Sequence, residues 1–163
     1  ARCEGFTSVD ECFNNAQPGQ IFDEVGDAYR QLIDMVLAAA PHAKIFLHNY
    51  DRAIPTGKGF VGLGNWLKEP MVRAHIDASL RQGIVNRLLF EFTKRLKAQC
   101  ARSSQITFVD SARIGDIARP EEIQGRGTLA ATEWGDELHP KPRGFNKIVR
   151  TCWAPAFAAA GLE

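Results

Sequence analysis

The chain has 163 residues, of which 45% are hydrophobic and 24% charged, the composition of a globular domain and about the length of one. Its formal net charge of +1 gives no broad positive field for nucleic acid or anionic lipid. The longest apolar run, Met35–Ala40, is far shorter than the ~18 residues of a membrane-spanning helix. We therefore expect one domain over residues 1–163, no nucleic-acid partner and no membrane span.

The first 20 residues are mostly polar and predict a loop. Cys3 and Cys12 bracket a short polar stretch, which indicates either a local disulfide or two free thiols in a reducing compartment. A disulfide would favour a secreted or periplasmic location, which the sequence otherwise leaves open. Cys100 and Cys152 fall in predicted helices and are expected to be buried thiols.

The next part of the chain predicts a helix, a strand and a loop. Residues 20–40 carry apolar side chains at helical spacing, and Pro41 ends the predicted helix. Residues 44–50 contain a short apolar run that predicts a buried strand. Residues 51–65 hold a proline and four glycines, and a loop of this length in a compact domain is often functional.

The second half continues the alternation of helices and strands. Residues 66–100 are helical in pattern, with Gly83 expected at a joint between two helices. Residues 105–110 predict a second strand, and an irregular stretch follows it. Residues 141–160 predict a last helix, which Pro155 is expected to bend or end early.

The predicted order, α-β-α-α-β-α, implies parallel pairing in an α/β fold. Two strands alone are marginal, and they are too few to cover the apolar faces of the predicted helices. We therefore expect this chain to supply part of a doubly wound sheet whose other strands lie elsewhere.

The most suggestive chemistry lies between the second strand and the last helix. Asp136 precedes His139 by three residues, a spacing that lets the carboxylate fold back onto the imidazole. The carboxylate would accept the Nδ1–H bond and hold the tautomer in which Nε2 acts as a base. The alternative is a surface aspartate and a histidine that caps the next helix. A loop at the carboxyl side of a strand favours a site, because α/β sites lie there.

The sequence Asp-Glu-Leu-His-Pro at residues 136–140, with Gly-Phe at 144–145, resembles the last motif block of the SGNH (GDSL-like) serine hydrolases. Residues 45–55 resemble the strand that follows the family's third block, and residues 28–44 fit the helix before it. The resemblance runs from about Phe22 to the C-terminus. It implies a three-layer α/β/α, flavodoxin-like sandwich, of which this chain would supply the C-terminal strands and helices.

The resemblance also implies a function. It makes His139 the base and Asp136 the orienting acid of a Ser-His-Asp triad that hydrolyses carboxylic esters, as an esterase or lipase does. A lipid, an acylated sugar or a small ester would be the substrate, and no metal or organic cofactor is implied.

Two blocks of the family have no match in this chain: the Gly-Asp-Ser nucleophile block and the Gly-x-Asn-Asp block of the oxyanion hole. Ser111 follows the predicted second strand, but a helix-cap or turn role is the expectation for it. The serine and the oxyanion groups are therefore expected from a missing N-terminal segment or a partner chain, and the isolated chain is expected to be inactive.

Two further interpretations stay open. The chain is alternatively a non-catalytic module of the same fold that binds a glycan or a protein. Residues 57–62 match Gly-x-Gly-x-x-Gly, but a dinucleotide site needs that turn directly between a strand and a helix. A flexible rim loop is the preferred interpretation of this stretch.

Other polar residues near the motif are expected to be structural. Asp51 and Asp110 each end a predicted strand and are expected to anchor turns, and His48 is expected to be a structural histidine. Glu137 lies between the two motif residues and should point away from them, so Glu137→Gln is expected to behave like the wild type.

Overall fold

The computed structural model describes residues 3–16, 18–59 and 65–162. Its regular elements, in chain order, are α1 (Val9–Ala16), α2 (Gly19–Ala39), β1 (Ile45–His48), α3 (Lys68–Arg73), α4 (Arg81–Cys100), β2 (Ile106–Val109), the short 3₁₀ helices Pro120–Ile123 and Ala131–Glu133, α5 (Pro142–Ile148), the π-helical turn Val149–Trp153, and α6 (Ala154–Ala159). None of the helices in these ranges is long and apolar enough to cross a membrane.

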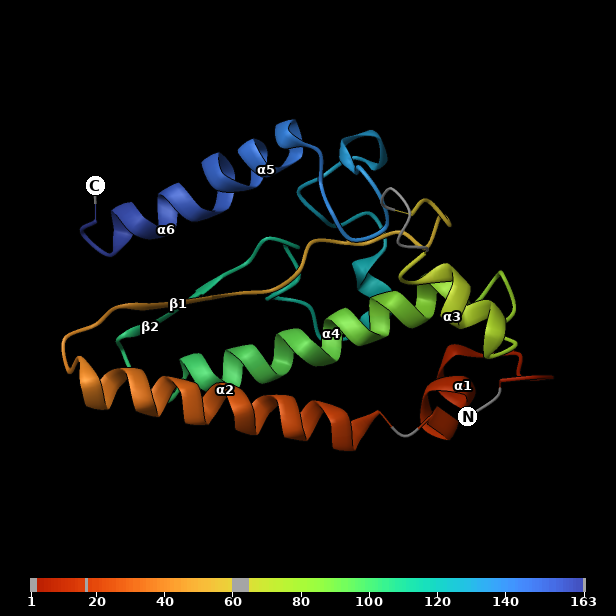
Figure 1. Ribbon diagram of the computed structural model, residues 1–163, viewed down its shortest axis with the longest axis horizontal. Coiled ribbons are helices and arrows are strands. Elements are labelled where there is room, and N and C mark those ends of the chain that lie inside the picture. Colours follow the sequence, from red (N-terminus) through yellow and green to blue (C-terminus); the bar gives the residue numbers. More distant parts are fainter. Residues whose placement is uncertain (1–2, 17, 60–64, 163) are drawn as a thin grey trace.

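The two strands pair in parallel, with Ile45 opposite Ile106 and His48 opposite Val109, as the sequence predicts for an α/β chain. Parallel strands need a long connection, and α3 and α4 supply it. The strands run between α2 and α4 on one side and α5 and α6 on the other (Figure 1). The chain is therefore a mixed α/β structure with helices against both faces of its strands.

Alternation along β1 explains how both faces are covered, because successive side chains of a strand point to opposite sides. Leu47 is buried in a cluster with Ile33 of α2 and Leu96 of α4. Phe46 points the other way, where its ring centroid lies 4.8 Å from that of Phe157 of α6 in an edge-to-face arrangement. The short apolar run of β1 therefore contributes to both layers.

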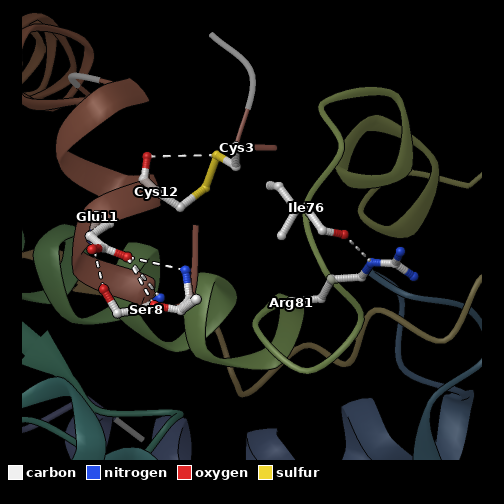
Figure 2. Close-up of a disulfide and its surroundings, with 7 residues drawn as sticks. Cys3, Ser8, Glu11, Cys12, Ile76 and Arg81 are labelled. Carbon is white, nitrogen blue, oxygen red and sulfur yellow. Dashed lines mark hydrogen bonds between the residues drawn. A yellow bond between two sulfur atoms is a disulfide. The ribbon is translucent and has the colours of Figure 1, made fainter. Parts of the chain in front are cut away.

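The expectation of a loop over the first 20 residues is wrong, because these residues include the helix α1. A capping box starts the helix: the Ser8 hydroxyl accepts a hydrogen bond from the Glu11 N–H, and the Glu11 carboxylate accepts one from the Ser8 N–H (Figure 2). The Ser-x-x-Glu pattern at residues 8–11 encodes this start within a segment whose polar composition favours a loop.

A disulfide joins Cys3 to Cys12, so the first of the two alternatives for this pair is the one that the structure contains (Figure 2). Both residues are buried, and the Cys3 N–H donates to the carbonyl of Ala74. The bridge thereby holds the N-terminal segment against the turn that follows α3. Cys100 and Cys152 are unbridged and partly buried.

Gly83 is not a joint between helices. The break lies earlier, after α3, where His75 takes a left-handed backbone with φ of 56° and the Arg81 guanidinium bonds the carbonyl of Ile76 (Figure 2). Gly83 instead lies in the first turn of α4, where a Cβ would come within 2.5 Å of Val9 Cγ2. The glycine is needed because α1 approaches α4 closely at this point.

Pro155 does not end the last helix early. Proline donates no N–H, so a helix that passes through it loses one main-chain hydrogen bond. The π-helical turn Val149–Trp153 precedes Pro155, and α6 continues beyond it to Ala159. The chain accommodates the proline by widening one turn of the helix.

Two features of this structure have no partner among its described residues. Ile45 and Asn49 donate their N–H groups to β2, and alternation along the strand turns the peptide groups of Phe46 and His48 to the other edge of β1. Helix α2 buries Ile33, yet its side chains Leu32 and Met35 are 59% and 69% exposed. Exposed edges and apolar stripes of this kind favour association.

We expect the isolated chain to self-associate through the exposed stripe of α2. The double change Leu32→Glu and Met35→Lys should shift it towards the monomer in sedimentation velocity, with a stability change within about 0.5 kcal/mol because both side chains are on the surface. Val72→Glu, which alters an exposed apolar side chain on α3, is the control and should leave association unchanged. A wild-type chain that stays monomeric at the same concentrations would contradict this expectation.

Candidate active site

The two motif residues lie in a closed loop over residues 134–140, which we call the dyad loop. Trp134 and Pro140 form an isolated antiparallel bridge, and the Gly135 N–H donates to the His139 carbonyl over 2.8 Å. A Cβ on Gly135 would lie 3.0 Å from that same carbonyl oxygen, so the loop closes this tightly only with glycine there. The backbone alone therefore brings the two ends of the motif together.

The structure brings Asp136 and His139 into contact, as the spacing predicts. Nδ1 of His139 lies 2.9 Å from Oδ2 and 3.1 Å from Oδ1 of Asp136. The Asp136 side chain is 2% exposed and the His139 side chain 54% exposed. The carboxylate is thus held inside while the imidazole reaches the surface, which is the arrangement of a base and its orienting acid.

Main-chain donors fix the Asp136 carboxylate before the histidine reaches it. Its Oδ1 accepts hydrogen bonds from the N–H groups of Leu138 at 2.7 Å and His139 at 2.8 Å. Burial would raise the pKa of Asp136, but these two donors and the His139 ring outweigh burial and hold that pKa below its usual value. The carboxylate is therefore ionised over the whole range in which imidazole titrates.

Tyr50 lies against the same loop, with its ring centroid 6.2 Å from that of Trp134. Burial, together with the negative charges of Asp136 and Asp51, raises the pKa of Tyr50 to about 12. The phenol is accordingly neutral at physiological pH and cannot serve as a base there.

Glu137 departs most from the sequence-based expectation. It points away from His139, but into the protein: its side chain is fully buried. Its carboxylate accepts main-chain N–H bonds from Gly57 and Leu67, each at 2.7 Å, and from Lys68 at 3.1 Å. These contacts remove the reason to expect wild-type behaviour of Glu137→Gln, and we expect that change to be damaging instead.

Asp51 and Asp110 anchor turns, as predicted. Asp51 accepts the N–H groups of Thr128 and Leu129, and burial raises the pKa of Asp51 despite these donors. Asp110 accepts the N–H of Gly115 at 2.7 Å and the side-chain amide of the fully buried Asn49 at 2.7 Å. Both carboxylates thus tie the strand ends to the irregular stretch after β2.

None of the five serines belongs to the dyad loop. Ser111 is 1% exposed, its hydroxyl has no hydrogen-bond partner in the structure, and it lines an apolar cavity of about 230 Å³ together with Trp134 and Trp153. Ser8, Ser79 and Ser103 bond groups within three residues of themselves. Ser104 precedes β2, at the opposite end of the strand from the dyad loop. A buried hydroxyl that is hydrogen-bonded to no base is not activated as a nucleophile, which fits the structural role expected for Ser111.

The glycine pattern at residues 57–62 is described in its first half. Gly57–Gly59 form no turn that opens a helix, and residues 60–64 lie outside the described part of the chain. Over the described ranges there is no group of three or more His, Cys, Asp or Glu side chains that could hold a metal ion. His48 stacks near Trp153, with ring centroids 5.1 Å apart, and its Nδ1 lies 2.9 Å from the Asn49 carbonyl, which fits a structural role.

Comparisons with known proteins add no family to this geometry. No protein-family model matches the chain, and no curated protein and no solved structure is significantly similar to it. The site is therefore interpreted from its own residues.

The lowered pKa of Asp136 makes a prediction about stability and pH. A carboxyl whose pKa is lower in the folded state stabilises the fold above its unfolded pKa, near 3.8, and loses that contribution as the pH falls through the folded value. We expect Asp136→Asn to lower the free energy of unfolding at pH 6, and the gap from the wild type to narrow progressively below about pH 4. Urea unfolding over a pH series measures this; a gap that stays constant to pH 2 would contradict it.

Proposed function

We propose that this chain forms the C-terminal part of an SGNH-type serine hydrolase domain that cleaves carboxylic esters. The observation that carries the proposal is the Asp136–His139 pair, in which a buried carboxylate lies 2.9 Å from Nδ1 of a half-exposed imidazole. A triad needs such a base, with its tautomer fixed by an ionised partner. The Asp-x-x-His spacing at the carboxyl side of the second strand supports the same assignment.

The proposed fold is a three-layer α/β/α, flavodoxin-like sandwich. Helices against both faces of β1 and β2 support it (Figure 1). Further support comes from the edge of β1 that β2 does not use and from the second apolar stripe on α2, around Leu32 and Met35. Additional parallel strands beside β1 would satisfy the first and cover the second.

In the proposed enzyme, Nε2 of His139 takes the proton of the serine hydroxyl as the serine oxygen attacks the ester carbonyl. Asp136 stabilises the imidazolium that results, and the imidazolium then gives its proton to the oxygen of the leaving alcohol. Water attacks the acyl-serine by the same route, which releases the acid and restores the serine. No step needs a metal or an organic cofactor.

The serine and the oxyanion donors of this mechanism come from polypeptide outside the sequence considered, either another segment of the same protein or a partner chain. The burial of Ser111 and the local hydrogen bonds of Ser8, Ser79 and Ser103 support this. The substrate class is an ester of a lipid, an acylated sugar or a small alcohol. The same observation favours the alternative, a non-catalytic module of this fold that binds a glycan or a protein.

We expect His139→Ala to lower turnover by several orders of magnitude in the form of the protein that includes the nucleophile, since binding and the oxyanion hole alone leave a residual catalysis of only ~10³- to 10⁴-fold over water. Asp136→Asn should be similarly severe, because an amide can present a donor where the Nδ1–H needs an acceptor. The melting temperature of His139→Ala should change little, since that side chain is 54% exposed. His42→Ala, at another exposed histidine, is the control and should keep wild-type turnover.

A fluorophosphonate probe distinguishes the two functions. The isolated chain should not be labelled, because Ser111 is buried and Ser8, Ser79 and Ser103 bond groups within three residues of themselves. The complete protein should be labelled at one serine outside this sequence, and His139→Ala should abolish the labelling. Mass spectrometry of the modified peptide locates the serine. Labelling of Ser111, or none in the complete protein, would contradict the hydrolase proposal, and the latter would favour the binding module.

A further inference from the structure

We propose that Glu137 is the positioning residue of the Asp136–His139 pair. Its buried carboxylate fastens the dyad loop to two segments, around Gly57 and Leu67, which we call the rim. The catalytic part of this inference rests on the proposed function. The structural part, that one carboxylate sets where the imidazole stands relative to the rim, does not depend on it.

The contacts of Glu137 reach both sides of the rim. Oε1 accepts the Gly57 N–H at 2.7 Å and the Lys68 N–H at 3.1 Å, while Oε2 accepts the Leu67 N–H at 2.7 Å. The Glu137 main chain adds a fourth bond, from its own N–H to the carbonyl of Lys58 at 3.2 Å. One residue thus brings together segments that are 70 and 80 positions away in the sequence.

These bonds are made by a carboxyl group that water does not reach. The Glu137 side chain is 0% exposed, and its partners are main-chain N–H groups. An ionised carboxylate surrounded by N–H donors forms strong, charge-assisted bonds. An amide in the same place would turn an N–H₂ group towards one of those donors, so glutamine fills the space and cannot reproduce the bonds.

The backbone of Gly57 allows its N–H group to reach the Glu137 carboxylate. Its φ is +84°, in the left-handed region that favours glycine, and a Cβ there would come within 2.8 Å of Lys68 Cδ. The close approach of residues 57 and 68 lets both of their N–H groups reach one oxygen. Changing Gly57 therefore perturbs the junction from the side opposite to Glu137.

The two neighbouring carboxylates of the dyad loop thus have different roles. Asp136 sets the tautomer and orientation of His139, and Glu137 sets where the loop that carries them stands against the rim. The rim includes Trp66, which is 44% exposed and directly precedes the bonded Leu67. In the proposed enzyme, Glu137 would fix the position of the base relative to the rim, and small misplacements of a base are costly.

The test uses two readouts that do not depend on activity, both made on the complete protein. In Glu137→Gln, the amides of Gly57, Leu67 and Lys68 should exchange with deuterium roughly 10- to 100-fold faster, as expected when a bond to a charged group is lost. The ¹⁵N signals of the His139 ring, recorded where the imidazole is neutral, should shift from a single Nδ1-protonated tautomer towards a mixture. Where the protein is active, kcat/KM should fall, although Glu137 touches no reacting atom.

Glu133→Gln is the matched control. Glu133 is also a buried carboxylate of this region, but it bonds the Ala130 N–H and the Lys147 ammonium rather than the rim. Its replacement should cost stability while the His139 signals and the rim amides stay as in the wild type. Should Glu137→Gln fail to fold, Gly57→Ala tests the same junction and should give the same two shifts.

The outcomes separate the two proposals. If Glu137→Gln, or Gly57→Ala in its place, melts at a lower temperature but leaves the His139 signals and the rim amides unchanged, the residue is merely structural and the positioning role is wrong. If both readouts shift while the complete protein neither hydrolyses esters nor binds the fluorophosphonate probe, the positioning role holds and the hydrolase proposal fails.

Discussion

Buried carboxylates that accept main-chain N–H bonds hold together the carboxyl end of the two-stranded sheet. The chain after β2 is largely irregular, so its peptide groups find few partners in a sheet or a long helix, and buried peptide groups need partners. Asp51, Asp110 and Asp136 each accept two main-chain N–H groups of this stretch, and Glu137 accepts three from residues 57–68. Charge-assisted bonds take the place of regular secondary structure here. Removal of one such acceptor leaves several main-chain donors without a hydrogen-bond partner.

The Asp136–His139 pair follows from the same device. Two main-chain N–H groups donate to Oδ1 of Asp136, and its Oδ2 faces Nδ1 of the imidazole. Because these bonds fix the orientation of the Asp136 carboxylate, the carboxylate determines the orientation of the His139 ring. An orienting acid that is itself held by the backbone is pre-organised, which is the property that electrostatic catalysis requires.

Sequence patterns predicted what depends on neighbours along the chain. Both strands, α2 and the Asp136–His139 contact were predictable, because hydrophobic periodicity or a three-residue spacing encodes each of them. The start of helix α1 is also encoded, in the capping box of Ser8 and Glu11, although the polar composition of the segment favours a loop. The role of Glu137 was not predictable, because its partners lie 70 and 80 residues away and main-chain donors leave no trace in residue type. Gly83 misled for the same reason: its neighbour Val9 belongs to a distant helix.

The long sequence separations have a consequence for how the fold is reached and left. Helices α2 and α4 make local contacts and can form early, whereas the pairing of Ile45 with Ile106 and the Glu137 bonds to Gly57 and Leu67 each close a loop of 60 residues or more. Contacts that form after the folding barrier has been crossed leave the folding rate nearly unchanged and act on the unfolding rate. The long-range bonds of Glu137 and Asp51 should therefore set the lifetime of the native state, and the helices the speed at which it is reached.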